Sequence, residues 1–199
     1  MIGIGGSTKA QALATLVNMT NDVAPISRDE YKARIQQAQL LMQAENIDAL
    51  YLNAGTNLYY FTGTRWYASE RMVAAIIPQS GDIFYIAPHF EVDTLKQFMH
   101  VGGDIFSWHE HESPYQLLID SFNQKQLKCD TLAIDESTPY FIADGIKSVA
   151  PSMSLKNSKN ITSGCRMQKS AQEIALLQRA KDMTLAVHKA VASILNVGI

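Results

Sequence analysis

The densest group of metal-ligand side chains in the sequence is residues 108–112, Trp-His-Glu-His-Glu, which places two imidazoles and two carboxylates side by side. These donor types suit zinc or manganese, and in an extended segment His109 and His111 would face the same side. A site needs further ligands, and the other histidines are scattered: His89, His100 and His188. The segment favours a solvated polar loop. An independent metalloenzyme built around His109-Glu110-His111 is the less favoured alternative.

A second group, residues 57–71, has the composition of a recognition surface. It follows a strand-like run and combines aromatic side chains with two arginines and a carboxylate. We expect the triplet Tyr59-Tyr60-Phe61 to pack beneath a sheet. The sequence does not decide whether Arg65-Trp66-Tyr67 forms an exposed recognition loop or a simple loop. For Glu70 and Arg71, a local ion pair is the simplest interpretation. No nucleophile with a recognisable base accompanies them.

Composition narrows the class of protein. The 199 residues are 47% hydrophobic and 18% charged, which is typical of a globular chain. The net charge of −2 and the scattered Lys and Arg residues exclude a nucleic-acid or anionic-membrane surface. No apolar run approaches the ~20 residues of a membrane helix, and no signal peptide is recognisable. We expect a cytoplasmic protein in which Cys129 and Cys165 are buried or half-buried thiols.

Helical apolar spacing, compact apolar runs and capping motifs predict the elements that position these groups. Ser27-Arg28-Asp29-Glu30 has the form of a capping box and predicts a helix to about Glu45. Cap-like residues followed by proline, at residues 113–114 and 138–139, predict two further helices, and a fourth follows Pro88. Strands are expected at residues 48–53, 71–78, 82–87, 104–108, 131–135 and 153–156, with Gln79-Ser80-Gly81 as a hairpin turn. The pattern predicts an α/β fold with a mixed β-sheet flanked by helices.

The two ends of the chain have their own patterns. Lys9–Thr20 has helical apolar spacing, and Ser170-Ala171-Gln172-Glu173 is a second capping box. A final helix of about 26 residues is predicted after it, with an apolar face from Ile174 to Leu195. The segment Asn157–Gly164, rich in Ser, Asn, Thr and Gly, is the best candidate for a linker.

Short motifs occur along the chain in a characteristic order: Arg34, Leu40, Ile47-Asp48-Ala49-Leu50, Asn57-x-x-Tyr60-Phe61-Thr62-Gly63, Pro78, Ser80-Gly81, Pro88 and Glu91. This order resembles the N-terminal domain of the Xaa-Pro aminopeptidase, prolidase and creatinase family, the pita-bread metallopeptidases. Farther on, Arg166-x-x-Lys169-Ser170-x-x-Glu173-Ile174 and Ala180 resemble the stretch that opens the family's C-terminal catalytic domain.

The resemblance implies a domain organisation. Residues 1–27 are expected to form an N-terminal arm, 28–160 a creatinase-type N-terminal α/β domain, and 161–199 a linker with the opening helix of a catalytic domain that lies beyond this chain. In peptidases of the family, two Asp, one His and two Glu of that domain bind two divalent metals. We therefore expect no catalytic or metal-binding residue in this chain, and two Mn, Co or Zn ions in the full-length enzyme.

The resemblance also implies a role for the chain. The domain is expected to support a homodimer and to project a loop, within Thr64–Arg71, toward the substrate pocket of a neighbouring subunit. The substrate-binding candidates are Arg65, Trp66, Tyr67, Glu70 and Arg71. Trp66 and Tyr67 would supply apolar walls, and Arg65 or Arg71 would bind a substrate carboxylate.

The expected partners are then the chain's own catalytic domain, a second copy and proline-containing peptides, with no nucleic acid and no membrane. The full-length enzyme would hydrolyse peptide bonds involving proline, whereas the 199-residue chain alone would be inactive. Two alternatives stay open. One is a stand-alone binding or dimerisation module that uses the apolar face Ile174–Leu195, and the other is a fragment of a creatinase-like hydrolase that works without metal.

Overall fold

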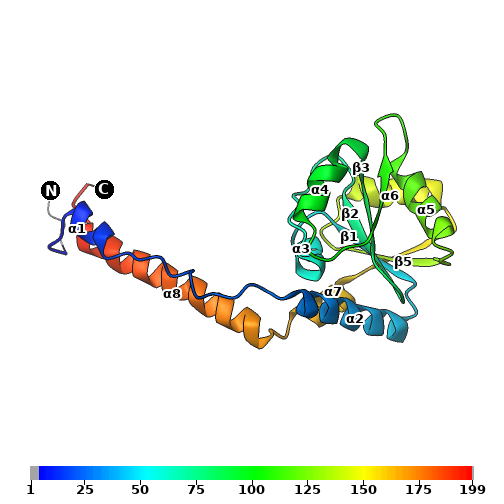
Figure 1. Cartoon of the computed structure of the whole chain (residues 1–199). Coiled ribbons are helices and arrows are strands. Elements are labelled where there is room, and N and C mark those ends of the chain that lie inside the picture. The colour runs from blue at the N-terminus through cyan, green and yellow to red at the C-terminus, as the bar shows by residue number, and fades with distance from the viewer. Residues whose placement is uncertain (1–4, 199) are drawn as a thin grey trace. The chain divides into compact units, whose positions relative to one another are not determined.

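The computed structural model describes residues 5–198, and the chain divides into two compact units (Figure 1). Residues 27–168 form an α/β unit. The second unit combines the N-terminal residues up to Ile26 with the segment from Lys169 onward. The predicted arm at residues 1–27 begins in residues 1–4, which lie outside the described part. The predicted domain boundaries at 27/28 and 160/161 stay predictions.

A six-stranded mixed sheet is the centre of the α/β unit. The strands are β1 (Ala49–Asn53), β2 (Ala74–Pro78), β3 (Phe84–Pro88), β4 (Asp104–Trp108), β5 (Thr131–Ile134) and β6 (Ser154–Asn157), in the order β4-β3-β2-β1-β5-β6. β2 is antiparallel to β1 and β3, and every other pair is parallel. The predicted β2–β3 hairpin and mixed sheet are therefore confirmed. All strands except β2 end at one edge of the sheet, which we call the carboxyl edge.

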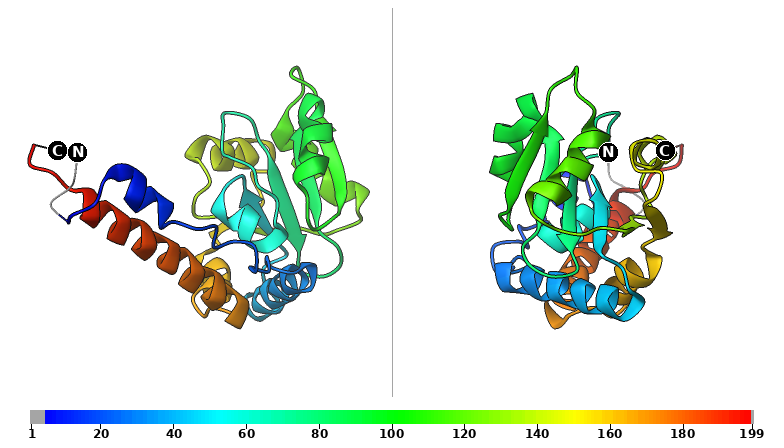
Figure 2. Two further views of the ribbon diagram at one scale, coloured as in Figure 1. Left: turned by 60° about the vertical axis from the view of Figure 1, so that its left-hand side comes forward. Right: turned by 90° about the vertical axis from the view of Figure 1, so that its right-hand side faces the viewer.

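Helices cover both faces of the sheet (Figures 1 and 2). One face carries α5 (Pro114–Gln124) and α6 (Tyr140–Val149), and the other carries α2 (Arg28–Glu45), α3 (Thr56–Thr62) and α4 (Val92–Phe98). A turn of 3-10 helix, His89–Glu91, precedes α4, and α7 (Lys159–Arg166) packs on α2. Because both faces are covered, β1, β2 and β3 are buried along their whole length.

The main core lies between the sheet and the helices α5 and α6. Tyr51, Ile76 and Phe84 of the central strands pack with Leu118 and Phe122 of α5. Phe84 meets Phe122 edge to face, with 5.8 Å between the ring centres. Each buried side chain of this size contributes about 1.5–3 kcal/mol. This core fixes the strand ends from which the loops of the carboxyl edge arise.

Capping residues set the ends of the helices much as predicted. The Ser27 hydroxyl accepts a hydrogen bond from the backbone N–H of Glu30, and α2 ends at Asn46 in the left-handed conformation, φ 51°. Both bonds of the second capping box form between Ser170 and Glu173. At Thr138-Pro139 the prediction is wrong in detail, because Pro139 itself occupies the N-cap and Thr138 makes no capping bond.

Three segments differ from the predictions. The segment Asn157–Gly164 is not a linker, because after the end of β6 it folds into α7 with Ile161 and Thr162 buried. Packing on α2 stabilises this hydrophilic helix despite its composition. The helix α3 was not predicted, and α1 (Lys9–Ala14) ends six residues before the predicted Thr20.

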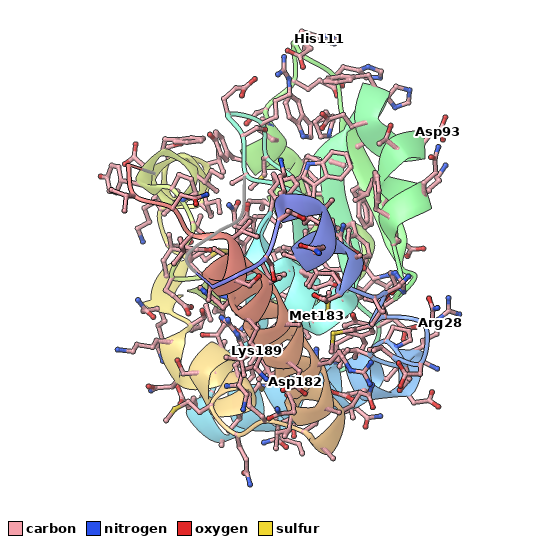
Figure 3. All side chains as sticks on the ribbon, turned by 90° about the vertical axis from the view of Figure 1, so that its left-hand side faces the viewer. Arg28, Asp93, His111, Asp182, Met183 and Lys189 are labelled. Carbon is pink, nitrogen blue, oxygen red and sulfur yellow. The ribbon has the colours of Figure 1, made fainter. Side chains whose placement is uncertain are left out.

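In the second unit, α8 (Ala171–Ile194) confirms the predicted final helix. The N-terminal segment runs antiparallel along it. The N–H of Ser7 donates to the carbonyl of Ser193 at 3.2 Å near one end. Nearer the other end, Arg179 binds Asp22 through two hydrogen bonds of 2.7 and 2.9 Å. Most apolar side chains of α8 remain exposed, including Met183 (Figure 3). No helix within residues 5–198 is long and apolar enough to cross a membrane.

Candidate functional site

The candidate loop, residues 64–71, connects α3 to β2 at the carboxyl edge of the sheet. α3 precedes the loop and ends at Gly63, whose positive φ of 71° lets the chain turn sharply. A Cβ atom at residue 63 would lie 2.7 Å from the Cβ of His100, so the turn packs tightly on the neighbouring segment. The turn at the start of the loop is therefore closely packed.

Arg65, Trp66 and Tyr67 line a cavity of about 240 Å³ together with Gly55, Thr56 and Tyr59. The Arg65 guanidinium lies 5.9 Å from the centre of the Tyr59 ring, and Trp66 packs edge-on against Phe98, with 6.3 Å between the ring centres. Tyr67 is 82% exposed. Within residues 5–198, no carboxylate lies within ion-pair distance of Arg65. A free guanidinium beside aromatic walls can bind a ligand that carries both a carboxylate and an apolar ring.

Glu70 and Arg71 do not join this cavity. The Arg71 Nε donates to Glu110 Oε1 at 3.0 Å, and the guanidinium also pairs with Glu70, as predicted, and lies 5.4 Å from the centre of the Phe90 ring. The hydrogen bond to Glu110 raises the pKa of Arg71. The five predicted residues are thus divided. Arg65, Trp66 and Tyr67 lie at the cavity, whereas Glu70 and Arg71 form an ion-pair cluster with Glu110, in the segment that follows β4.

The histidine-rich segment forms the exposed turn between β4 and α5, with His111 at its tip (Figure 3), so the predicted solvated loop is confirmed. The rings of His109 and His111 are nearly parallel, 11° apart, with 5.8 Å between their centres. The described residues contain no group of three or more His, Cys, Asp or Glu side chains arranged to hold a metal ion.

The aromatic triplet is only partly in the core, which corrects the prediction. Phe61 is fully buried, Tyr60 is half-buried and Tyr59 is 44% exposed. The three residues lie on α3, where consecutive side chains point in directions about 100° apart. Because of this helix, the triplet cannot face one side, and Tyr59 instead becomes a wall of the cavity.

A buried polar network fills the position where β1 and β5 lie side by side. From β1 the chain continues into α3 on one face of the sheet, and from β5 it continues into α6 on the other face. Open α/β sheets commonly bind ligands in the crevice between two neighbouring strands whose connections diverge in this way. Here Asn57 Nδ2 donates to Asp135 Oδ1 at 2.8 Å, and both residues are at most 3% exposed. The N–H and hydroxyl of Ser137 donate to the same Asp135 oxygen, both at 2.9 Å.

Glu136 extends the network to α7. Its Oε2 accepts hydrogen bonds from the hydroxyls of Ser158, at 3.1 Å, and Thr162, at 2.9 Å. Burial raises the pKa of Glu136, but hydrogen bonds to its carboxylate from its own backbone N–H, Thr162, Ser158 and Asn57 outweigh burial, so the net pKa is lowered. The charged form of Glu136 therefore holds α7 against the end of β5.

The network also joins two sequence motifs. Arg166 Nη1 donates to Asn57 Oδ1 at 2.6 Å, and the Tyr60 hydroxyl donates to the carbonyl of Cys165 at 2.7 Å. The Arg166 guanidinium lies 5.7 Å from the centre of the Tyr60 ring. Asn57 and Arg166 are 109 residues apart, so their pairing cannot be recognised from the chain alone. The motifs themselves were the only sequence signal for these contacts.

The fold and the site together describe an α/β domain with a mixed sheet and the candidate loop at its carboxyl edge. A family model for the creatinase/prolidase N-terminal domain matches residues 34–168. The chain therefore belongs to the creatinase/prolidase N-terminal domain family. This result confirms the family expected from the order of the motifs and the fold expected from the hydrophobic patterns.

Individual relatives agree with the family assignment. An uncharacterised peptidase of Schizosaccharomyces pombe is 27% identical over 195 residues, which cover 91% of this chain and 42% of the relative. Among solved structures, the dipeptidase PepE of Mycobacterium ulcerans matches with a TM-score of 0.68 and 19% identity, over 84% of this chain and 51% of that chain. The N-terminal domain of an Xaa-Pro dipeptidase of Lactobacillus brevis matches with a TM-score of 0.58 and 22% identity, over 68% of this chain and 99% of that domain.

The lengths of these proteins differ. This chain spans 42% of the yeast peptidase and 37% of an uncharacterised peptidase of Staphylococcus epidermidis. By contrast, it matches nearly the whole of the isolated Lactobacillus domain. The region in common is thus the N-terminal domain of longer peptidases.

Proposed function

We propose that this chain is the non-catalytic N-terminal part of an Xaa-Pro peptidase and that residues 64–71 help to close the substrate pocket of a neighbouring subunit. The observation that carries the proposal is the cavity lined by Arg65, Trp66 and Tyr67. It combines a guanidinium that has no carboxylate partner among the described residues with aromatic walls. A peptide that contains the apolar ring of proline and ends in a carboxylate has the complementary chemistry.

The geometry separates the roles of the two arginines. Arg71 is already bound to Glu70 and Glu110, so a substrate carboxylate would have to displace these contacts. Arg65 meets no such competition, and we assign it the substrate carboxylate. Trp66 and Tyr67 supply the apolar walls, and Glu70 and Arg71 hold the base of the loop.

The proposal includes a catalytic domain that follows α8 and a homodimer that brings the loop to the second active site. Two Mn, Co or Zn ions in that domain would activate water for attack on a peptide bond involving proline. In this proposal, the loop of this chain helps to bind and orient the peptide and to exclude water from the pocket.

The test compares Arg65→Ala and Trp66→Ala with wild type in the longer protein that contains the catalytic domain. We expect kcat/KM for Xaa-Pro substrates to fall about tenfold or more in each variant, which corresponds to at least one lost charge-assisted contact or aromatic wall. Lys128→Ala, an exposed change on the opposite edge of the sheet, is the matched control. Unchanged kcat/KM in both test variants would refute the role of the loop.

The exposed face of α8 favours a second candidate function, a stand-alone dimerisation module. Ile174, Leu177, Val187, Val191 and Leu195 are each at least 44% exposed, and a mostly apolar cavity of about 400 Å³ lies at Met183 and Val187. Such a face is typical of a surface that another protein element covers. A stable monomer of the 199-residue chain in native mass measurements would count against this function.

A further inference from the structure

The short helix α3 has contacts in two places that the proposed function does not connect. Thr56 and Tyr59 line the cavity at the candidate loop. Asn57 and Tyr60, on the next positions of the same helix, bind Arg166 and Cys165 at the end of α7. Because α3 has only seven residues, both groups of contacts lie within about two turns of one helix.

The second place lies just before the chain enters α8. Arg166 is the last residue of α7, and α8 begins at Ala171. Arg166 is held by the 2.6 Å bond to Asn57, and the preceding carbonyl is held by the 2.7 Å bond from Tyr60. Asn57 is itself fixed by its 2.8 Å bond to Asp135. The junction toward α8 is therefore anchored to α3 rather than only to neighbouring residues of α7.

The construction of α3 favours movement as a unit. Leu58 and Phe61 are fully buried and keep the helix on the sheet. Gly55 and Gly63 bound it in conformations with positive φ, 140° and 71°, which glycine adopts most readily. Changes in direction of the chain are thus concentrated at the two ends of α3. Between them, a rigid segment carries both sets of contacts.

We infer that α3 couples the junction before α8 to the candidate cavity, with Asn57 and Arg166 as the positioning pair. In this arrangement, neither residue touches the ligand. The Asn57–Arg166 bond sets where Tyr59 and Thr56 stand relative to Arg65, Trp66 and Tyr67. The coupling is a property of this chain, whereas its use in placing a substrate rests on the proposed function.

The experiment uses the 199-residue chain with both tryptophans replaced by 5-fluorotryptophan. Trp66 reports on the cavity, and buried Trp108 reports on the core. In Arg166→Met we expect the Trp66 fluorine resonance to shift and the Trp108 resonance to stay in place. Amide exchange in residues 56–62 should accelerate about tenfold or more, because a hydrogen bond to a charged group has been lost. Lys159→Met, an exposed change on the same helix, is the control and should alter neither.

Two further variants make the result decisive. Arg166→Lys retains a donor and should restore the Trp66 resonance at least partly. Tyr60→Phe removes the hydroxyl that donates to the Cys165 carbonyl and keeps the aromatic ring. It should shift the Trp66 resonance in the same direction as Arg166→Met.

The inference is overturned if residues 159–166 exchange faster in Arg166→Met and Tyr60→Phe while Trp66 and residues 56–62 behave as in wild type. That result would confine the anchor to α7. Because no peptide is present, it would leave the proposed role of Arg65 untouched. Conversely, if Arg65→Ala left kcat/KM unchanged, the proposed role of Arg65 would be refuted, but the coupling through α3 would still stand.

Discussion

Replacing Asn57 by Asp tests the buried network at the point where β1 and β5 meet. The two polar atoms of the wild-type amide have different roles. Nδ2 donates to Asp135, and the amide also helps to lower the pKa of Glu136, whereas Oδ1 accepts from Arg166. In Asn57→Asp the donor becomes a second carboxylate oxygen at 2.8 Å from an existing carboxylate. The change keeps the shape of the side chain, so its effect reports on hydrogen bonding and charge.

The expected cost follows from these contacts. Losing a hydrogen bond to a charged group costs about 1.5–3 kcal/mol. Two like charges about 4 Å apart add up to about 4 kcal/mol at an effective dielectric constant of 20. Proton uptake by the carboxylate pair and a stronger ion pair with Arg166 offset part of this repulsion. We therefore expect Asn57→Asp to lower the free energy of unfolding by about 2–4 kcal/mol at pH 7.5.

The same variant has a characteristic pH dependence. In the folded variant the carboxylate pair retains a proton to higher pH than in the unfolded chain, so the folded state binds more protons. Stability is then lost as pH rises above the ordinary Asp value of about 3.9, by up to about 1.4 kcal/mol per pH unit. The deficit relative to wild type should therefore be smaller at pH 5 than at pH 7.5.

Urea unfolding monitored by circular dichroism at both pH values measures these differences. The exposed substitution Asn123→Asp is the control and should change stability by no more than about 0.5 kcal/mol at either pH. A deficit below 1 kcal/mol for Asn57→Asp at pH 7.5, or an equal deficit at the two pH values, would refute the structural reasoning.

Two other predictions concern the turn before the loop and the thiols. A non-glycine residue in the left-handed conformation costs about 1–2 kcal/mol. Gly63→Ala should lower the free energy of unfolding by more than this, because the added Cβ would also meet His100, whereas Gly81→Ala, with φ 85° and open space around it, should cost only the conformational strain. Equal shifts in the urea midpoint for the two variants would contradict this prediction. Burial raises the pKa of Cys129 to about 12 and that of Cys165 to about 11. Alkylation by iodoacetamide at pH 7.5 should thus be at least about tenfold slower in the folded chain than in urea, and should accelerate with pH; equal rates would disprove the burial of both thiols.

Local patterns predicted most of the fold. Compact apolar runs identified the buried strands, and hydroxyl caps such as Ser27 and Ser170 located the starts of α2 and α8 within one residue. These signals operate within a few residues, so they can be recognised before any tertiary contact is known. The helices α3 and α7 were not predicted. α3 has only seven residues, which is too short for a clear helical periodicity, and α7 is hydrophilic, so its apolar face contrasts little with the rest of the helix.

The sequence by itself determined the family, through the order of its motifs, and the composition of the candidate loop. Only the tertiary structure separated Arg65 at the cavity from Arg71, whose partner Glu110 lies 39 residues farther along the chain. The same holds for Asn57, which meets Arg166 across 109 residues. The direction in which a loop side chain points depends on partners that folding brings close, and local propensity contains no information about them.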